Sequence, residues 1–457
     1  MSFSTKSTWS PGGVRELLWI SLPTIVSQSA GSLIMVTDRY LLRVLGESHS
    51  PAAMAGGFAA LTLIMFCLGL VAYVTPLVGH YVGAKKPEYA CSVLSQSFII
   101  IGISYPFLLL IGRLGFGPYV AWAGLPAEEA HLAQQYFRIM NVGCLFTLAD
   151  VAMGAFFAGI GKTWVVMLIS IMGCLVNAPL GYYLIHYGIG GYWSGIEGAA
   201  IGAVGSALFM LGLYLYFYLQ PHMRKTYGFR ASLHINPVLL KKLFRYGAPT
   251  GTEFFLIFIV FTCFTSLYHS YGEGPALAMT AVQNWDVLSF LPMWGLNIGL
   301  MSLVGRHLGA RNIDLALRTT WSGFKVAAIV VGASVIAFTL FPEPLLQVFL
   351  PETMTLDRSQ VLGLGIPMLR LVALYCVAHS INLVLGATLR AAGDTRACMY
   401  AGISIHWSLL LVVYLSVRYW QFPPLVTWQF FVYGAFAESL FFILRFYWGP
   451  WKTARVI

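Results

Sequence analysis

The sequence predicts an all-α protein that crosses a membrane many times and consists of two related halves. Of its 457 residues, 58% are hydrophobic and only 10% are charged, and the mean hydropathy is +0.75. Long apolar segments recur along the whole chain, and residues 77–90 closely resemble residues 303–316. A chain of this composition does not belong to the ordinary water-soluble class of proteins.

The duplication is visible as identical residues at a constant spacing. The segment LVGHYVGAKKPEYA (77–90) aligns with LVGRHLGARNIDLA (303–316) at an offset of 226, and after a slip of six residues the match resumes at 232. An internal repeat in an apolar chain is typical of a transporter whose binding site lies where the repeats meet. Because six helices return the chain to the same side, we expect parallel rather than inverted repeats. Identical pairs include Pro23/Pro249, Gly79/Gly305, Gly154/Gly386 and Gly161/Gly393.

The apolar segments are long enough to cross ~30 Å of hydrocarbon as helices, which takes ~20 residues each. Backbone groups in lipid must be paired within the segment, and these segments are too long for barrel strands. We therefore predict an N-lobe (1–220) and a C-lobe (243–457) of six helices each, separated by a polar cytoplasmic linker (221–242). The twelve predicted spans are 16–42, 53–80, 92–112, 131–158, 164–187, 198–220, 242–270, 276–304, 318–340, 361–389, 397–418 and 425–447.

Lysine and arginine residues predict the orientation. With the N-terminus inside, 20 of the 27 fall on the inner side of the predicted helices and seven on the outer side. Loops rich in these residues stay in the cytoplasm, so we expect a multi-pass protein of the inner (cytoplasmic) membrane with both termini cytoplasmic. The net charge of +10 is then a topology signal, and nucleic-acid binding is not expected because no soluble basic face is predicted. No cleavage site follows the polar start, so no removable signal peptide is expected.

The sequence contains no pattern that indicates an enzyme or a cofactor. Seven cysteines are scattered singly, without the spacing of a metal site or a disulfide framework. The segment GIGKT (159–163) lacks the first glycine of a phosphate loop, because position 156 is Phe. Neither HExxH nor GxSxG occurs. We expect no catalytic activity, no metal and no cofactor, and transport that is passive or driven by an ion gradient.

Several motifs follow one another in a characteristic order along the chain. LP at 22–23 stands fifteen residues before Asp38, and the turns GHYVGAKK and GRHLGARN occupy equivalent places in the two repeats. In order and spacing these motifs resemble the MATE (multidrug and toxic compound extrusion) family of the multidrug/oligosaccharidyl-lipid/polysaccharide exporter superfamily. The resemblance covers nearly the entire chain and also includes VNAPLGYYLIHYG (176–188), GIEGAAIGAVGS (195–206), GAPTGTE (247–253) and LRAAGDTR (389–396).

The resemblance implies twelve helices in two six-helix lobes around a V-shaped central cavity. It also implies export of a small amphipathic, often cationic, organic substrate in exchange for H⁺ or Na⁺, by a monomer in the lipid bilayer.

Acidic residues inside predicted spans are the strongest functional candidates. Each costs about 2.5–3.5 kcal/mol on insertion scales, so each needs a cavity, a partner or a proton. Asp38 matches the family's coupling carboxylate by its distance from Pro23, and protonation would remove its buried charge. The alternative is an interfacial carboxylate paired with Arg43. Five of the seventeen acidic residues fall in spans, namely Asp38, Asp150, Glu253, Asp286 and Glu438.

Glu253 follows Pro249 by four residues, in the C-lobe counterpart of the first helix. This spacing resembles some MATE branches, whereas others carry the glutamate about one turn further along, where this chain has Ile257. The alternative is a helix-start carboxylate near Lys241, Lys242 or Arg245. Both interpretations stay open at this point.

Three further positions bear on the choice of ion. His379 stands where some sodium-coupled relatives carry Asp, and neutral imidazole is a poor ligand for a hard sodium ion, which prefers oxygen. Gly181 stands where another branch carries an Asp four residues after its Asn. We therefore predict proton coupling, with an N-lobe relay of Asp38, Asn177 and Asp150. Alternatively, His379 is a hydrogen-bonded core residue and Asp150 a helix–helix contact.

The repeated scaffold carries different ionisable residues in its two copies. Asp150 aligns with Asn382, Ser206 with Glu438, and Asp38 with Phe264. We therefore predict an asymmetric coupling site, centred on Asp38 in the N-lobe.

Aromatic side chains suit a cavity for flat cations, through cation–π contacts. They also form belts at membrane interfaces, so this assignment has an ordinary alternative. The predicted cavity residues are Tyr40, Phe66, Tyr73, Phe254, Trp285, Asp286, Phe290 and Trp294.

Other functional classes make different demands on the sequence. A lipid-linked oligosaccharide flippase of the same superfamily should line its cavity with several Arg or Lys residues, whereas the intramembrane charges here are chiefly acidic. A membrane-embedded enzyme needs a convergent nucleophile and base or a metal cluster, and a receptor needs a sizeable soluble domain. The antiporter remains the favoured interpretation.

Overall fold

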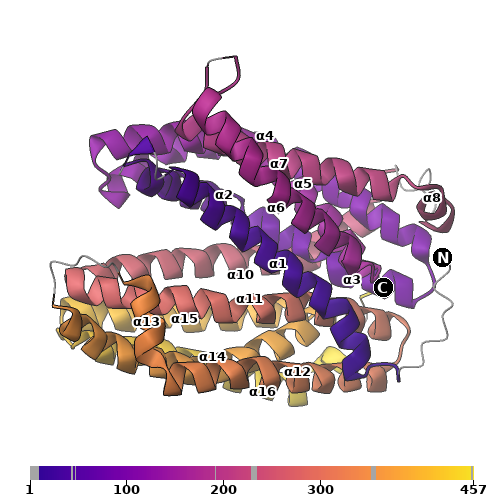
Figure 1. The fold of residues 1–457 in the computed structure, drawn as a ribbon. Coiled ribbons are helices and arrows are strands. Elements are labelled where there is room, and N and C mark those ends of the chain that lie inside the picture. The colour runs from indigo at the N-terminus through magenta and orange to yellow at the C-terminus, as the bar shows by residue number, and fades with distance from the viewer. Residues whose placement is uncertain are drawn as a thin grey trace. The chain divides into compact units, whose positions relative to one another are not determined.

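The computed structural model describes residues 10–42, 45–46, 48–190, 192–227, 234–350, 357–453 and 456–457, with only the backbone of Arg39. Arg43, the alternative partner of Asp38, lies outside these residues. Within them, twelve helices are long and apolar enough to cross a membrane (Figure 1). Each overlaps one predicted span, which confirms the predicted fold class. The largest difference is in the third span, which continues to Ala123 instead of ending near 112.

The chain divides into two compact units. The N-unit comprises Val26–Phe255 together with Ile457, and the C-unit comprises Met1–Ile25 and Leu256–Val456. The helices that lie wholly within the N-unit are α2 (His49–Ala72), α3 (Val74–Gly83), α4 (Pro87–Ala123), α5 (Ala127–Gly159), α6 (Thr163–Tyr187), α7 (Ile196–Tyr218) and α8 (Pro221–Tyr227). Those wholly within the C-unit are α11 (Glu273–Gly309), α12 (Ile313–Leu340), α13 (Pro342–Phe349), α14 (Arg358–Ala391), α15 (Thr395–Arg418), α16 (Pro424–Trp448) and the short η2 (Pro450–Lys452).

Two long helices contribute to both units. In α1 (Val14–Leu42) the residues up to Ile25 belong to the C-unit and the rest to the N-unit. In α10 (Pro237–His269) the residues up to Phe255 belong to the N-unit and the rest to the C-unit. The predicted lobes, 1–220 and 243–457, follow the sequence repeat and stay a prediction. The compact units are defined by which residues contact one another. The first part of α1 therefore belongs to the C-unit, and the first part of α10 belongs to the N-unit.

Each exchanged segment crosses a helix of its unit at a glycine. A Cβ on Gly295 of α11 would lie 2.6 Å from the Cα of Ile25, and a Cβ on Gly69 of α2 would lie 2.6 Å from the Cα of Gly251. The two crossings correspond at the offset of 226. At the first, the Thr24 hydroxyl donates to the Gly295 carbonyl at 2.7 Å. Small residues allow such close helix packing in membranes, so the sequence duplication is also a duplication of a helix contact.

The turns that follow α3, α5, α11 and α14 repeat at the level of the backbone. Lys85 and Arg311, which correspond at the offset of 226, both have φ of 58°. Gly161 and Gly393, which correspond at 232, have φ of 79° and 86°. The left-handed conformation is free of strain for glycine but costs an L-residue roughly 1–2 kcal/mol. Both copies therefore keep a basic residue where the backbone favours glycine.

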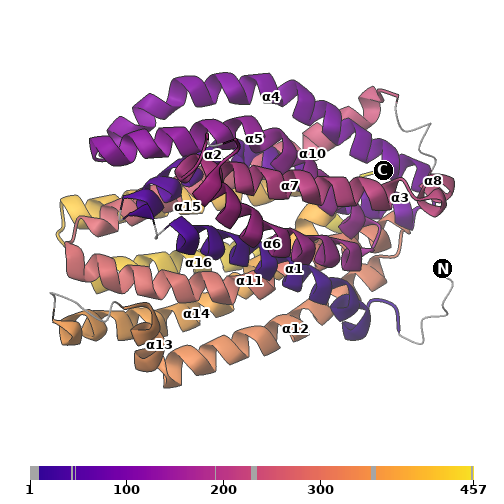
Figure 2. The same ribbon diagram turned by 45° about the horizontal axis from the view of Figure 1, so that its top comes forward.

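The slip of six residues in the repeat falls near a helix that only one copy breaks. In the N-unit, α4 runs unbroken for 37 residues (Figure 2). In the C-unit the corresponding helix ends at Leu340, and residues 342–349 form the separate helix α13, with Pro342 in its first turn. Figure 1 shows α13 at a steep angle to the long helices of its unit. The break places α13 against α11, α12 and α14.

Candidate functional site

The structure divides the predicted site residues between the two units. The N-unit holds Asp38, Asp150, Asn177 and Glu253, with the aromatic residues Tyr40, Phe66, Tyr73 and Phe254. The C-unit holds His379 and Asp286, with Trp285, Phe290 and Trp294.

Asp38 and Asn177 face each other in the N-unit. Asp38 is half-buried on α1, and Asn177 on α6 is 0% exposed. The amide of Asn177 lies close enough to interact with the Asp38 carboxylate. Neither Nδ2 nor Oδ1 of Asn177, however, meets hydrogen-bond geometry with a described residue. Beside them, a Cβ on Gly181 would still be 3.9 Å from Oδ1 of Asp38. The arrangement is a carboxylate facing a buried amide whose hydrogen-bonding capacity is unused.

The other two N-unit acids lie on different helices. Asp150 on α5 is half-buried, and its Oδ1 has no hydrogen-bond partner in the described part of the chain. Its charge acts on the hydroxyl of Tyr214 on α7. Glu253 on α10 is only 1% exposed, two residues beyond the Gly251 crossing. A buried acid at a helix crossing is expensive in a membrane unless it is paired or protonated.

The predicted aromatic residues of the N-unit differ in how much of each side chain is exposed and could contact a ligand. Tyr73 is 0% exposed, and its ring stacks on Tyr246 with centroids 5.6 Å apart. As placed, it packs the unit and presents no surface. Tyr40 is 70% exposed, whereas Phe66 and Phe254 are half-buried.

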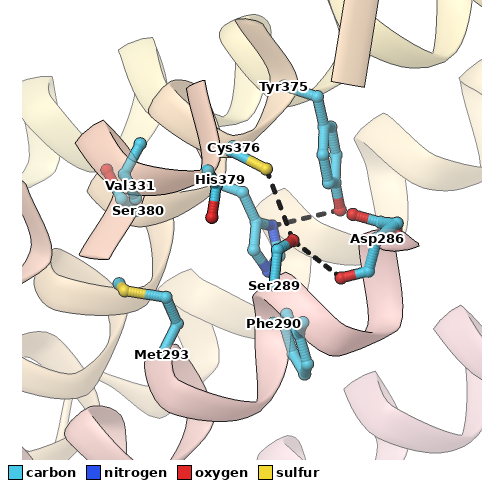
Figure 3. Close-up of a pocket in the computed structure, with 10 residues that line it drawn as sticks. Asp286, Ser289, Phe290, Met293, Val331, Tyr375, Cys376, His379 and Ser380 are labelled. Carbon is cyan, nitrogen blue, oxygen red and sulfur yellow. Dashed lines mark hydrogen bonds between the residues drawn. The ribbon is translucent and has the colours of Figure 1, made fainter. Parts of the chain in front are cut away.

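A small cavity lies within the C-unit between α11, α12 and α14 (Figure 3). It has room for about one water molecule, far less than a drug-sized ligand requires. It brings His379, a predicted ion-coupling residue, together with Asp286 and Phe290, which were predicted as cavity residues. The complete lining is Asp286, Ser289, Phe290, Met293, Val331, Ser334, Tyr375, Cys376, His379 and Ser380.

One ring nitrogen of His379 has a hydrogen-bond partner, and the other is buried without one among the described residues. The Tyr375 hydroxyl lies 3.2 Å from Nδ1 of His379, one turn along α14, and the two rings stack 5.1 Å apart. Nε2 has no hydrogen-bond partner among the described residues, and the ring of Phe290 lies 5.0 Å away. The Ser289 hydroxyl donates to the backbone carbonyl of Asp286 at 2.8 Å, and Asp286 also lines the cavity.

Two features of this region escaped the sequence prediction. One is Tyr375, which the spacing of one helical turn from His379 could have indicated. The other is a buried pair in which Asn382 Nδ2 donates to Glu438 Oε2 at 2.9 Å. These two side chains are 5% and 8% exposed. Their positions correspond to Asp150 and Ser206 in the first repeat, and that comparison was the available signal.

The remaining C-unit aromatics are engaged in packing. The indole N–H of Trp285 donates to the Leu345 carbonyl of α13 at 2.7 Å, and Phe349 meets its ring edge at 5.5 Å. Trp294 packs on Phe290 with centroids 5.4 Å apart. Trp285 therefore anchors α13 to α11.

The segment 159–163 forms the turn between α5 and α6. A helix precedes it, whereas a phosphate loop follows a strand. Burial lowers the pKa of the Lys162 ammonium group, and its Nζ lies 3.1 Å from the Met223 sulfur. In the described ranges, no group of three or more His, Cys, Asp and Glu side chains is arranged to hold a metal ion.

Known proteins are similar to this chain over most of its length. A probable multidrug resistance protein NorM from Mannheimia succiniciproducens is 24% identical over 408 residues, covering 86% of this chain and 84% of that protein. The multidrug resistance protein MdtK of Photorhabdus laumondii is 23% identical and covers 97% of both.

Solved structures share the fold. A MOP superfamily transporter from Pyrococcus furiosus matches with a TM-score of 0.85 at 20% identity, covering 98% of this chain and 97% of that one. An outward-facing multidrug resistance MATE family transporter matches with a TM-score of 0.84 at 19% identity, covering 96% of both chains. The MatE family model matches residues 23–183 and 249–415, which are more than half of the chain and follow its two repeats. The chain therefore belongs to the MATE (MatE) family of membrane transporters.

Proposed function

We propose that this chain is a secondary active antiporter that exports amphipathic, often cationic, organic compounds in exchange for protons. Its family membership supports a transporter, and the relatives named NorM and MdtK are described as multidrug resistance proteins. The proposed orientation places both termini in the cytoplasm and the protein in the inner membrane, where it acts as a monomer. Half-buried or exposed aromatic residues, among them Tyr40, Phe66 and Phe254, would contact the cargo.

The observation that carries the proposal is the pair of Asp38 and Asn177. A carboxylate in a membrane helix is stable when it takes up a proton or finds donors, and the unbonded Asn177 amide supplies both a donor and an acceptor beside it. Pro23 lies fifteen residues earlier on the same helix, and it removes one backbone hydrogen bond. Loading and releasing a proton at Asp38 would therefore act on a helix that is already weakened.

The residues present favour protons over sodium. Sodium is a hard ion that prefers several oxygen ligands. Gly181 contributes no side-chain oxygen beside Asp38, and His379 contributes ring nitrogens. Moving one charge through 100 mV provides ~2.3 kcal/mol, which shifts a two-state equilibrium about fiftyfold. One proton per cycle is therefore enough to bias transport outward.

Ethidium uptake into inverted membrane vesicles, in which export from the cytoplasmic side appears as uptake, tests the proposal, with proton and sodium gradients imposed separately. We expect the wild-type chain to respond to the proton gradient, and Asp38→Asn to abolish that response while the protein stays folded. Asp314→Asn is the matched control, because Asp314 is exposed in the first turn of α12. Normal proton-driven transport by Asp38→Asn would show that Asp38 is not a coupling residue. A wild-type chain that ignores both gradients would argue for a flippase or a passive carrier.

A further inference from the structure

We propose that the exposed face of the first half of α12 binds the phosphate group of an anionic phospholipid, with Arg318 and Lys325 as the binding cations and Trp321 beside them. The partner is a lipid of the surrounding bilayer and not the exported cargo, so the inference goes beyond the proposed function. It uses only the proposed orientation, which places this end of α12 in the inner leaflet.

Arg318, Trp321 and Lys325 lie on one exposed side of α12. They are spaced by three and four residues, which places them on one helical face. All three side chains are exposed, whereas Thr320 and Ala327 on the opposite side of the helix are 0% and 1% exposed. Figure 2 shows α12 along one edge of the C-unit. In a membrane this side of the helix therefore faces lipid.

Beyond Lys325 the same side of α12 is apolar. Ile329, Ile336 and Leu340 continue it and are 73%, 58% and 66% exposed. Only about 22 Å of helix lies between Lys325 and Leu340 at 1.5 Å per residue, whereas the hydrocarbon layer is about 30 Å thick. Tilting the helix would shorten its apolar part further. Lys325 therefore lies at a depth that hydrocarbon normally occupies.

Lys325 lacks an acidic partner within the described part of the chain. Its neighbours one turn away on the exposed side are Trp321 and Ile329. Neither Arg318 nor Lys325 forms an ion pair with a described acidic residue. Asp314 lies one turn before Arg318, and about 16 Å of helix separates it from Lys325. An ammonium group at this depth is costly unless an anion accompanies it, and the anion that a bilayer supplies is a lipid phosphate.

The side chains of this face suit a phosphate group in a lipid headgroup. A guanidinium group binds two phosphate oxygens at once, and an ammonium group binds them as a point charge. The Cα–Cβ bond of a helical residue tilts toward the helix N-terminus, so the long Lys325 side chain extends toward the headgroups and toward Arg318. Tryptophan is enriched at the level of the headgroups. A phosphate group between the two cations would satisfy both.

The corresponding positions of α4 in the N-unit carry no basic residue. The two serine hydroxyls there donate to carbonyls of α4 itself, each at 3.2 Å. The N-unit has its basic residues in the turn before this helix, at Lys85 and Lys86, which is sufficient to set topology. Topology alone therefore does not account for Lys325. At the offset of 226, Arg318, Trp321 and Lys325 correspond to Ser92, Ser95 and Ile99.

Quenching of tryptophan fluorescence by brominated lipid tests the site. The full chain is reconstituted into nanodiscs of phosphatidylcholine with a minor fraction of phosphatidylglycerol, and the bromine atoms are carried on the acyl chains of either lipid at an equal fraction. The difference between the wild type and Trp321→Phe gives the contribution of Trp321. We expect brominated phosphatidylglycerol to quench Trp321 more than brominated phosphatidylcholine does. Equal quenching by the two lipids would overturn the inference.

Substitution of the two cations tests their role. Titrating the phosphatidylglycerol fraction gives an apparent affinity, which Arg318→Gln and Lys325→Gln should each weaken about fivefold, the effect of one basic residue near an anionic surface. Both side chains are exposed, so both variants should unfold thermally like the wild type. Arg396→Gln is the matched control, because Arg396 is exposed at the start of α15 in the same unit. Site variants that keep the wild-type affinity would contradict the proposal.

Inorganic phosphate distinguishes a lipid site from a site for a free ion. At constant ionic strength, excess inorganic phosphate should leave the quenching of Trp321 unchanged, because a hydrated ion does not enter the hydrocarbon layer. If it abolishes the preference for phosphatidylglycerol, the site binds a free anion and the lipid assignment is wrong. The quenching does not depend on transport, so a chain that prefers phosphatidylglycerol but ignores both ion gradients would overturn only the proposed function.

Discussion

Asn177 shows a conflict between stability and function at a single residue. Its side chain is 0% exposed, and neither polar atom has a hydrogen-bond partner in the described part of the chain. A buried polar group without a partner costs about 1–3 kcal/mol. Selection for folding alone would place an apolar residue here. The presence of an amide opposite Asp38 is therefore an argument for a role in coupling.

Replacing Asn177 by Leu should stabilise the protein and impair transport. We expect an increase of about 1–2 kcal/mol in the free energy of unfolding, because an unbonded amide is removed. Proton-driven ethidium efflux should fall in the same variant. Thermal unfolding in detergent and ethidium uptake into inverted vesicles measure the two effects.

The matched control for Asn177 is Asn297, a buried amide in the C-unit whose Nδ2 does donate, to the Leu383 carbonyl at 3.1 Å. Asn297→Leu should lower stability, because it breaks that bond. If Asn177→Leu lowers stability as much as Asn297→Leu, then Asn177 is an ordinary structural amide.

At the residue scale the sequence predicted the candidates better than their partners. The five intramembrane acids are visible because carboxylates are rare in apolar segments. The hydrogen bond between Asn382 and Glu438 joins residues 56 positions apart on two helices. A local sequence pattern cannot predict such a pair. Tyr375 is one of 24 tyrosines, and the structure places its hydroxyl 3.2 Å from Nδ1 of His379.

At the scale of elements, α13 is the largest departure from the predicted helices. Its eight residues are too short to cross a membrane, and the sequence gives them no apolar span. The twelve long spans could be predicted, because hydrophobic length is a local property. The end of α4 was missed, since Arg113, Gly115 and Pro118 lower the apolar signal within a helix that nevertheless continues.

Trp285→Phe should loosen α13 without changing the cargo site. The substitution keeps a large ring and removes the hydrogen bond to the Leu345 carbonyl, a loss of about 1 kcal/mol. We expect faster proteolysis of the connection between α12 and α14 and an unchanged KM for ethidium. Trp321→Phe is the control, because Trp321 is 51% exposed on α12. A raised KM with normal proteolysis would instead make Trp285 a cargo contact.

At the scale of the whole molecule, the first 25 residues belong to a unit otherwise formed by the last 200 or so. Leu17 and Ile20 are 0% and 3% exposed within the core of the C-unit. The Ser322 hydroxyl donates to the Gly12 carbonyl at 2.8 Å. The repeat alone could not predict this exchange, because aligned sequences reveal equivalent positions but not which copy each helix half packs against.

Fragment expression tests the exchange. Residues 243–457 alone should be unstable in detergent, because the α11 surface around Gly295 lacks its partner. Co-expression with residues 1–242 should restore a folded complex, measured by size-exclusion chromatography and thermal unfolding. Co-expression with residues 26–242 should not. A stable, monodisperse 243–457 fragment would contradict the prediction.

The exchange also has a consequence for biogenesis. Residues 26–255 are contiguous, so the N-unit can be completed while the ribosome is still translating the second repeat. Met1–Ile25 is synthesised first, yet its partners in α11 and α12 appear only after residue 272. The start of α1 must therefore wait in the membrane through most of translation, and the earliest segment of the chain is among the last to reach its final contacts.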